Sequence, residues 1–505
     1  MTRPQLDERV TAVPPGPGPL AEQIPHQRPR RADAPRATVP GRPGRPLWRP
    51  GLLTFPLAFA VYLTVSWSGW SDTGHAGVVS WIVTLAWVLP IANALVGLSG
   101  LWIARSHVRR AATDADIPVI DELLIVTVPT VARADTLPAL ARSLRSFGEH
   151  LPPVFARMRV DVIIEEGCAE EAAVTEMAAA GDLFRIVMVP SSYRSPRGSL
   201  FKARANDYAL RRRIVEGEAR DDVWVLHMDD DTGVGPDSAA SIARFIDAQR
   251  QAGADACHLA QGVLSYPREH ASSRLLWLAD AMRPGCDNGM FAATTGRGRP
   301  YAGLHGELLL IRSSVEAEIG WDFGPQAIVE DSEFGLRFCG RYPGRSAWFP
   351  GLCYGASPAT LKDFVRQRAR WSWGMLHLAG RRDIRARDRL LLTYNLGLWL
   401  VGPVIQIAFF LLPFIPGTNF SASPVVIGLL PVCALNAAYA FWLYWEGLKI
   451  NAAASARAGR RVWEPLVLIP LIPVFTLFEA AGAFLGFVRF ARQSKPTFAV
   501  IAKPR

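Results

Sequence analysis

Long apolar segments on both sides of a polar middle region constrain this chain more than any other feature. Each segment has the roughly 20 residues that a helix needs to cross a hydrocarbon core of about 30 Å. Two segments precede the middle region and three follow it: 51–70, 77–104, 390–414, 425–445 and 465–488. Half of the residues are hydrophobic and the mean hydropathy is positive, which is high for a soluble enzyme. We therefore expect an integral membrane protein with a folded domain between two groups of transmembrane helices.

Basic residues next to these segments predict their orientation. The loops at 71–76 and 416–423 contain no Lys or Arg, whereas Arg105, Arg109 and Arg110 follow the second span. Basic loops remain on the cytoplasmic side of a membrane. The central domain is therefore expected in the cytoplasm, at the plasma membrane if the cell is bacterial.

The last apolar segment, 465–488, is interrupted by Pro470, Pro473 and Glu479. A single crossing would place the basic tail that follows, 489–505, outside the cell, against the positive-inside rule. Pro and Glu are tolerated at membrane depth where protein covers them. We therefore expect a broken or re-entrant hairpin here, with the tail in the cytoplasm.

Residues 1–49 are rich in Pro, Arg and Gly and have almost no large apolar side chains, so we expect a disordered tail. Many of the arginines behind the net charge of +10 lie in this tail and beside the spans. Anionic membrane lipids are therefore the expected partners, and nucleic acid is not. The six cysteines are scattered without a CxxC pair, which indicates a reducing compartment and no zinc site.

Short apolar runs alternate with amphipathic stretches in the middle region. Four runs predict strands: 123–128, 160–166, 184–189 and 223–228. Between the first two, apolar side chains recur at helical spacing after Thr136, the expected N-cap. This alternation predicts an α/β fold with a Rossmann-like, mainly parallel sheet covered on both faces. We expect two membrane helices at 50–104 and a catalytic domain at 105–385, which includes an amphipathic interfacial helix near 358–380. Further membrane helices are expected at 386–488.

An acidic triplet ends the fourth predicted strand, where VWVLHM runs into Asp229, Asp230 and Asp231. Carboxylates at the carboxyl end of a strand suit a hard cation, Mg²⁺ or Mn²⁺, held against a diphosphate. An acidic surface turn would give the same triplet. His227, just before it, is expected to be a packed strand residue.

Polar residues lie at or just past the ends of two other strands: Thr127, Pro129 and Thr130 for the first, and Glu165 and Glu166 for the second. Because ligands bind at the carboxyl ends of parallel strands, these residues are candidates for a nucleotide cleft. Ordinary turns between strand and helix explain them equally well.

Two further motifs occur toward the end of the domain. Glu330 and Asp331 precede a predicted helix, where the helix dipole alone favours acidic residues. Gln367, Arg370 and Trp371 lie in an amphipathic stretch that also suits the membrane interface. Arg suits bidentate contacts to a diphosphate, and a flat indole suits the face of a sugar.

Together these motifs resemble the D…DxD…ED…QxxRW pattern of membrane-bound inverting family-2 glycosyltransferases, which have a GT-A catalytic domain. Four segments are similar to the egghead-type β-1,4-mannosyltransferases: GSLFKARANDYAL (198–210), HMDDDT (227–232), QGVLSYPRE (261–269) and VEDSEFGLR (329–337). The resemblance covers residues 123 to about 378. The chain has Asp230 and Asp231 where the family often has Glu, and Glu165 and Glu166 where Asp is usual, so the reach of these carboxylates differs.

The resemblance implies a role for each motif. Asp229 and Asp231 hold the metal and the diphosphate, with Asp229 nearer the ribose. Asp331 is the base that takes the proton from the acceptor hydroxyl, and Glu330 raises the proton affinity of Asp331 through like-charge repulsion. The expected donor-binding set is Thr127, Pro129, Glu165, Glu166, Lys202, Asp229, Asp230, Gln367, Arg370 and Trp371. Most basic residues near Lys202 are expected to form a solvated face.

The expected function is metal-dependent transfer of one sugar from a nucleotide-sugar to a lipid-linked or membrane-near glycan acceptor. By resemblance the donor is GDP-mannose. The alternative is a processive polysaccharide synthase of the cellulose or hyaluronan type, which uses a UDP-sugar. About five spans and no large added domain favour single transfer, because a translocating pore is less easily built. A scaffold or transporter without catalysis does not explain why four motifs occur in the order a transferase needs.

Overall fold

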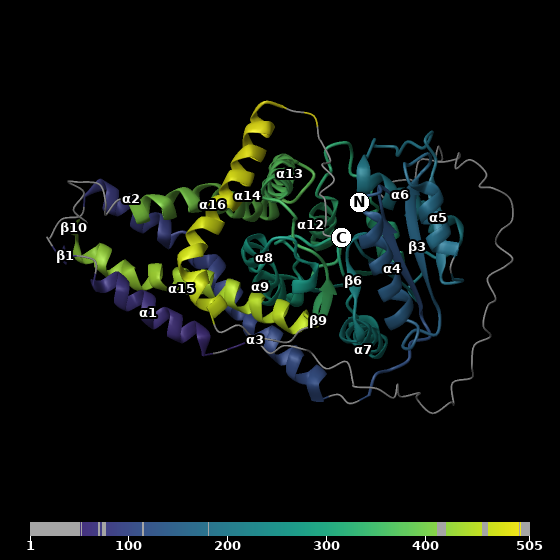
Figure 1. The fold of residues 1–505 in the computed structure, drawn as a ribbon, viewed down its shortest axis with the longest axis horizontal. Coiled ribbons are helices and arrows are strands. Elements are labelled where there is room, and N and C mark those ends of the chain that lie inside the picture. The colour runs from purple at the N-terminus through teal and green to yellow at the C-terminus, as the bar shows by residue number, and fades with distance from the viewer. Residues whose placement is uncertain are drawn as a thin grey trace. The chain divides into compact units, whose positions relative to one another are not determined.

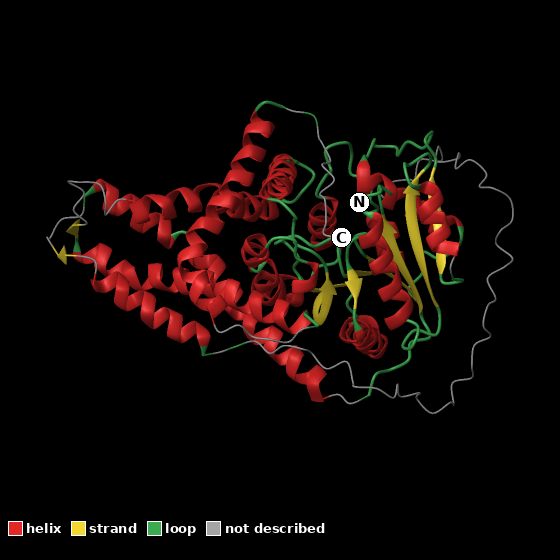
Figure 2. Ribbon diagram, in the orientation of Figure 1, coloured by secondary structure: helices red, strands yellow, loops and turns green. Residues whose placement is uncertain are grey.

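The computed structural model describes residues 51, 53–68, 71–72, 77–113, 116–179, 181–411, 421–456, 463–493 and 495. The expected disordered tail at 1–49, the loop at 416–420 and nearly all of the expected basic tail after residue 493 lie outside this range. Helices and strands of the described residues are drawn in Figures 1 and 2.

An eight-stranded sheet organises the central domain. The four predicted strands form its first half: β2 (Leu123–Pro129), β3 (Met158–Glu165), β4 (Phe184–Val189) and β5 (Val223–His227). They run parallel in the order β4-β3-β2-β5. Their carboxyl ends therefore meet along one edge of the sheet.

The second half of the sheet departs from the predicted arrangement. It consists of four strands: β6 (Gly233–Val234), β7 (Leu259–Ser265), β8 (Leu309–Arg312) and β9 (Ser346–Tyr354). β8 is antiparallel to both β5 and β7, β6 is antiparallel to β9, and β7 is parallel to β9. The sheet is therefore mixed: six of its eight strands run in the same direction, as the mainly parallel prediction requires, and β8 and β6 run opposite to them.

Helices cover both faces of this sheet, as predicted. The longer ones are α4 (Leu137–His150), α5 (Glu171–Ala179), α6 (Phe201–Val215), α7 (Pro236–Ala252), α11 (Ser313–Ile319) and α12 (Glu330–Arg341). Successive side chains of β8 point to opposite faces of the sheet. Leu310 joins the core beneath α4 and α7, whereas Leu309 and Ile311 join the core beneath α11 and α12. Short helices α8 (Arg274–Asp280), α9 (Met282–Cys286), η3 (Asp287–Phe291) and α10 (Ala292–Thr294) connect β7 to β8.

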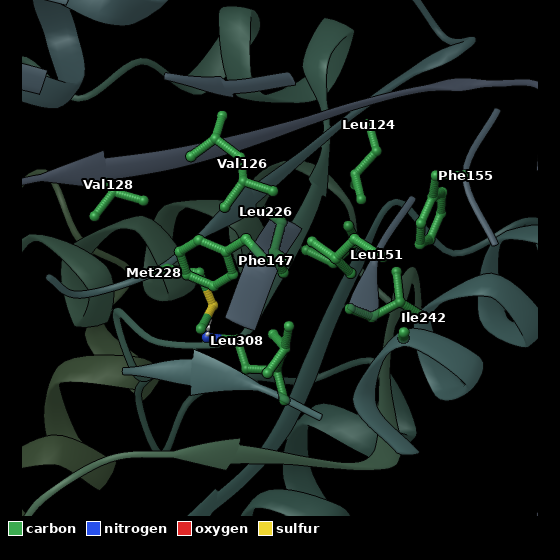
Figure 3. Packing of buried hydrophobic residues seen from close by; sticks show 14 of the residues in the cluster. Leu124, Val126, Val128, Phe147, Leu151, Phe155, Leu226, Met228, Ile242 and Leu308 are labelled. Atoms are coloured by element: carbon green, nitrogen blue, oxygen red, sulfur yellow. Dashed lines mark hydrogen bonds between the residues drawn. The ribbon is translucent and has the colours of Figure 1, made fainter. Parts of the chain in front are cut away.

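The apolar face of α4 forms the centre of one core (Figure 3). Phe147 is fully buried in a cluster that also contains Val126 of β2 and Leu226 of β5. Burial of such a side chain stabilises the fold by about 1.5–3 kcal/mol. Thr136 occupies the predicted N-cap position, but its hydroxyl donates to the carbonyl oxygen of Arg133 at 3.0 Å instead of capping the helix.

The remaining helices come from the apolar segments and from the stretch before the second group. They are α1 (Thr54–Ser68), α2 (Val78–Val88), α3 (Ile91–Thr113), α13 (Leu361–Gly380), α14 (Ala386–Leu411), α15 (Pro424–Ala454) and α16 (Trp463–Ala491). Within the described residues, three helical spans are long and apolar enough to cross a membrane: Ser80–Ala111, Pro424–Ala454 and Leu466–Ala491.

The predicted break in the last segment is wrong, because α16 is one continuous helix of 29 residues that contains Pro470 and Pro473. Protein covers this helix, since α13 packs along it. Glu479 accepts hydrogen bonds from Arg368 Nε at 3.0 Å and from Trp399 Nε1 at 3.3 Å. These hydrogen bonds satisfy the Glu479 carboxylate, so the helix continues where we expected a break.

Two glycines let α15 approach the short helices α8 and α9 at backbone contact. A Cβ atom on Gly447 would lie 1.5 Å from the carbonyl oxygen of Ala281, and one on Gly285 would lie 1.9 Å from that of Leu443. No side chain fits at either position without moving a backbone. This contact joins a candidate membrane span to the segment between β7 and β8.

Gly447→Ala is expected to lower stability by about 1–3 kcal/mol, because the added methyl overlaps the carbonyl group of Ala281 between α8 and α9. Gly428→Ala, in the same helix, is the matched control, since nothing lies within 4 Å of a Cβ there. Thermal unfolding of the detergent-purified protein measures both, and equal midpoints would contradict the close contact.

Candidate active site

A cavity of about 500 Å³ opens at the carboxyl edge of the parallel strands. It is lined by β2, β3, α6, the turn after β5, the loop before β8, α12, α13 and α14. Eleven predicted site residues line it: Pro129, Glu165, Lys202, Asp229, Asp230, Asp231, Glu330, Asp331, Gln367, Arg370 and Trp371. Motifs far apart in the sequence thus share one cavity.

Two predicted donor-binding residues lie elsewhere. Thr127 is fully buried within β2, and its hydroxyl forms a hydrogen bond with His227 Nδ1 at 3.2 Å. Glu166 is exposed and accepts a hydrogen bond from the backbone N–H of Ser191 at 2.7 Å. Neither side chain lines the cavity: Thr127 lies two residues before the end of β2, inside the sheet, and Glu166 follows Glu165 on the opposite face of the extended chain. His227 is the packed strand residue we expected.

The turn after β5 presents the acidic triplet to the cavity. The backbone N–H and the hydroxyl of Thr232 both donate to the carbonyl oxygen of Asp229, at 3.2 and 3.0 Å, and so fix the turn. Asp230 Oδ2 accepts a hydrogen bond from the Thr130 hydroxyl at 2.7 Å. Asp231 is only 8% exposed. The carboxylates are therefore held by the local chain rather than left to rotate in solvent.

Lys202 of α6 lies among these carboxylates. Its ammonium group forms an ion pair with Asp229, donates to the carbonyl oxygen of Gly306 at 3.4 Å and lies 3.8 Å from Glu330 Oε1. Burial would lower the pKa of Lys202, but Asp229, Glu330 and Asp331 outweigh burial and raise it. Lys202 therefore stays charged and offsets repulsion between the acidic groups.

Glu330 and Asp331 form the first turn of α12. Asp331 Oδ1 accepts a hydrogen bond from the backbone N–H of Ser332 at 2.7 Å. Burial raises the pKa of both carboxyls, and the like charge of Asp331 contributes to a pKa of about 7 for Glu330. The helix-start and catalytic interpretations of this pair are therefore compatible.

The cavity residues that the sequence analysis missed include Arg283, His305 and Glu307. His305 Nε2 lies 2.6 Å from Asp287 Oδ1, and this carboxylate outweighs burial to raise the pKa of His305. Burial, followed by the charge of Asp229, raises the pKa of Glu307 to about 7. The available signal was the sequence HGE immediately before an apolar run, which becomes β8.

Helix α13 places Arg370 and Trp371 at the cavity wall. Burial lowers the pKa of Arg370, and the carboxylates of Glu330 and Asp229 oppose this effect. The Trp371 ring lies under two guanidinium groups, with its centroid 4.7 Å from Arg283 Cζ and 4.8 Å from Arg368 Cζ. These two cation–π contacts hold the ring in place.

A buried ionic network ties α13 to the apolar helices. Arg368 is 1% exposed, forms an ion pair with Asp280 of α8, and donates to Glu479 of α16 at 3.0 Å. Glu479 also accepts from Trp399 of α14. The Ser372 hydroxyl adds a hydrogen bond to the carbonyl oxygen of Ala483, at 2.9 Å. The position of α13 beside α16, visible in Figure 1, therefore fixes the cavity wall to a candidate membrane span.

Glu479→Gln is expected to lower stability by about 1–3 kcal/mol, because a buried charge partner of Arg368 is lost and an amide group then faces Trp399. Glu318→Gln is the control, since Glu318 and Arg341 form an exposed pair at 3.2 Å. Thermal unfolding in detergent should show the larger shift for Glu479→Gln. Equal shifts would mean that the network contributes no more than a surface ion pair.

Residues 224–445 match the family model described as "Glycosyl transferase family group 2". The chain therefore carries a glycosyltransferase family 2 domain, as the resemblance of its motifs predicted. This match begins in β5 and ends in α15, so it includes the acidic triplet, Asp331 and the α13 residues.

Among curated relatives, the β-1,4-mannosyltransferase egh of Drosophila melanogaster is 28% identical over 312 residues, which cover 60% of this chain and 64% of that protein. The β-1,4-mannosyltransferase bre-3 of Caenorhabditis briggsae is 27% identical over 234 residues, or 46% of this chain and 50% of the relative. The chain thus spans about one half to two thirds of the length of these relatives.

Among solved structures, one that matches this chain is the mannosyltransferase PcManGT from Pyrobaculum calidifontis in complex with GDP-Man and Mn²⁺. It has a TM-score of 0.44 and 16% identity and covers 81% of this chain and 99% of its own. S. aureus TarS 1–349 has a TM-score of 0.32 and 12% identity and covers 63% of this chain and 89% of its own.

Proposed function

We propose that the protein is an inverting, metal-dependent glycosyltransferase that moves one sugar from a nucleotide-sugar to a lipid-linked or membrane-near glycan on the cytoplasmic face. The observation that carries this proposal is one cavity, within the family-2 match, that collects Asp229 to Asp231, Asp331 and the α13 pair Arg370 and Trp371. A leaving diphosphate, a base and an acceptor surface are the parts that sugar transfer requires.

The proposed sugar is mannose, since the curated relatives are β-1,4-mannosyltransferases, and the proposed donor is GDP-mannose. The carboxylates of Asp229 and Asp231 are hard oxygen donors of the kind Mg²⁺ and Mn²⁺ prefer. Among the described residues, no group of three or more His, Cys, Asp or Glu side chains is placed to hold a metal by itself. We therefore assign the ion jointly to these aspartates and the donor diphosphate, whose leaving charge it would neutralise.

Asp331 is the proposed base. Its raised pKa brings its proton affinity closer to neutral pH than that of an exposed aspartate, which suits proton transfer from a hydroxyl. Arg370 and Lys202 supply positive charge on the donor side. Trp371 offers its ring to the acceptor sugar.

The acceptor is proposed to approach from the membrane. Trp399 of α14 and Met375 of α13 line the cavity beside Trp371, so an apolar wall continues from the site to the helices of the C-terminal group. The cytoplasmic orientation follows from the basic residues after the second span and remains part of the proposal.

Asp331→Asn is expected to reduce donor-dependent nucleotide release by about 10²- to 10⁴-fold, because the base is lost while the shape of the side chain is kept. The assay uses detergent-purified protein, a glycolipid extract and Mn²⁺ or Mg²⁺, with GDP-mannose compared against UDP-glucose, UDP-galactose and UDP-N-acetylglucosamine. Glu166→Gln is the matched control and should retain full activity, since Glu166 lies outside the cavity.

Retention of donor binding by Asp331→Asn would separate loss of the base from loss of the site. Full activity in Asp331→Asn would overturn the assignment of the base. Mass spectrometry of the product should show addition of one hexose, whereas long polymers would favour the processive synthase.

The pH dependence of kcat/KM should show an acid limb, since the rate falls as Asp331 becomes protonated. Burial raises the pKa of Asp331, so this limb is expected above the ordinary range of aspartate. Glu330→Gln removes a neighbouring negative charge and should move the limb to lower pH. An identical limb in both proteins would argue against coupling of the two carboxyls.

A further inference from the structure

A second cavity, of about 120 Å³, lies at the start of α14 and is separate from the candidate active site. Five of its lining residues matter here, and we call their site the arginine cavity: Arg299, Tyr301, Arg385, Arg387 and Asp388. Three guanidinium groups thus surround a small space that contains one carboxylate. Neither the sequence motifs nor the proposed transfer reaction uses these residues.

Two of the three arginines lack a protein counter-charge. Arg385 Nε donates to Asp388 Oδ2 at 2.7 Å, which satisfies that carboxylate. Within the described part of the chain, neither Arg299 nor Arg387 forms an ion pair or a side-chain hydrogen bond. Burial raises the pKa of Tyr301, and the positive charges of Arg387 and Arg299 oppose that rise, so both groups act on the same phenol.

An anion would relieve the repulsion between these groups. Guanidinium groups bind phosphate oxygens through paired N–H donors, and the Tyr301 hydroxyl supplies a further donor. Arg387 lies in the first turn of α14, a helix of 26 residues whose positive end favours an anion at this point. The cavity is well below the roughly 300 Å³ of a typical ligand pocket, so it suits a single phosphate group rather than a nucleotide.

The surface next to the cavity identifies the source of the phosphate. Leu390 follows Arg387 by one helical turn, about 4.5 Å along the axis, and is 71% exposed. From there α14 continues as the apolar segment that we expect to enter the membrane. A phosphate site followed directly by an exposed apolar side chain matches the two chemistries of a lipid, a charged headgroup and an acyl chain. We propose that the arginine cavity binds the headgroup phosphate of an anionic membrane lipid.

This lipid would contact the same three elements that form the active-site wall. The loop with Arg299 and Tyr301 continues to His305, and α12 carries both Cys339 at the arginine cavity and Asp331 at the active site. Helix α14 likewise carries Arg387 at one cavity and Trp399 at the other. The proposed site nevertheless stands independently of the transfer reaction, because its test measures lipid binding.

The test compares lipid retention by native mass spectrometry of the full chain in detergent, with added phosphatidylglycerol or phosphatidylcholine and with inorganic phosphate as a competitor. Wild-type protein should prefer phosphatidylglycerol, and Arg299→Gln/Arg387→Gln should weaken that binding at least about tenfold. Tyr301→Phe, which keeps all charges, should weaken it by a smaller factor.

Arg133→Gln/Arg220→Gln is the matched control, because it removes two positive charges from arginines that are 49% and 52% exposed and that pair with surface aspartates. Equal loss in both double variants would show diffuse surface attraction and overturn the proposal. Unchanged phosphatidylglycerol binding in Arg299→Gln/Arg387→Gln would overturn it as well. Binding of inorganic phosphate without a preference for phosphatidylglycerol would reject the lipid and assign the site to a free anion.

Discussion

The concentration of acidic groups in one partly enclosed cavity is the constraint on which the rest of the site depends. Seven carboxyls line it: Glu165, Asp229, Asp230, Asp231, Glu307, Glu330 and Asp331. Like charges in a poorly solvated space raise one another's pKa and destabilise the fold unless cations or protons intervene. Lys202 and Arg370 supply positive charge, and the pKa values near 7 of Glu307 and Glu330 allow protons to do the same. The charge balance of the cavity therefore depends on Lys202, Arg370 and bound protons.

The cavity wall is also part of the apolar framework of the protein. Arg368 follows Gln367 directly in α13 and donates a hydrogen bond to its Oε1, while its ion-pair partners are Asp280 and Glu479 in other helices. The same helix therefore faces the active site on one side and α16 on the other. A buried charge that is fully paired specifies position, because sliding α13 along α16 would leave Arg368 unpaired at a cost of several kcal/mol. The membrane-side helices thus determine where Arg370 and Trp371 stand.

Much of the site was predictable from strand ends and motif spacing. The residues that were missed or misplaced have physical explanations. Asp229 follows a run that is recognisable as a buried strand, and α12 begins at the predicted acidic pair. Glu307 was missed because it precedes its strand, β8. Since β8 is antiparallel to β5 and β7, its amino end lies at the same edge of the sheet as their carboxyl ends, where the cavity opens. Thr127 lies two residues before the end of β2, and only the packed sheet shows that its side chain is enclosed there beside His227.

The sequence by itself determined the four parallel strands, the apolar segments and the residue types that suit a diphosphate and a base, since these follow from local periodicity and composition. Only the tertiary structure decided which charged residues meet. Arg213, one of the basic residues that follow Lys202 in α6, is buried against Glu316 at 2.7 Å, and Arg299 joins Arg387 only because a loop and the start of α14 pack together. Pairing between distant segments depends on long-range packing, which local pattern does not encode.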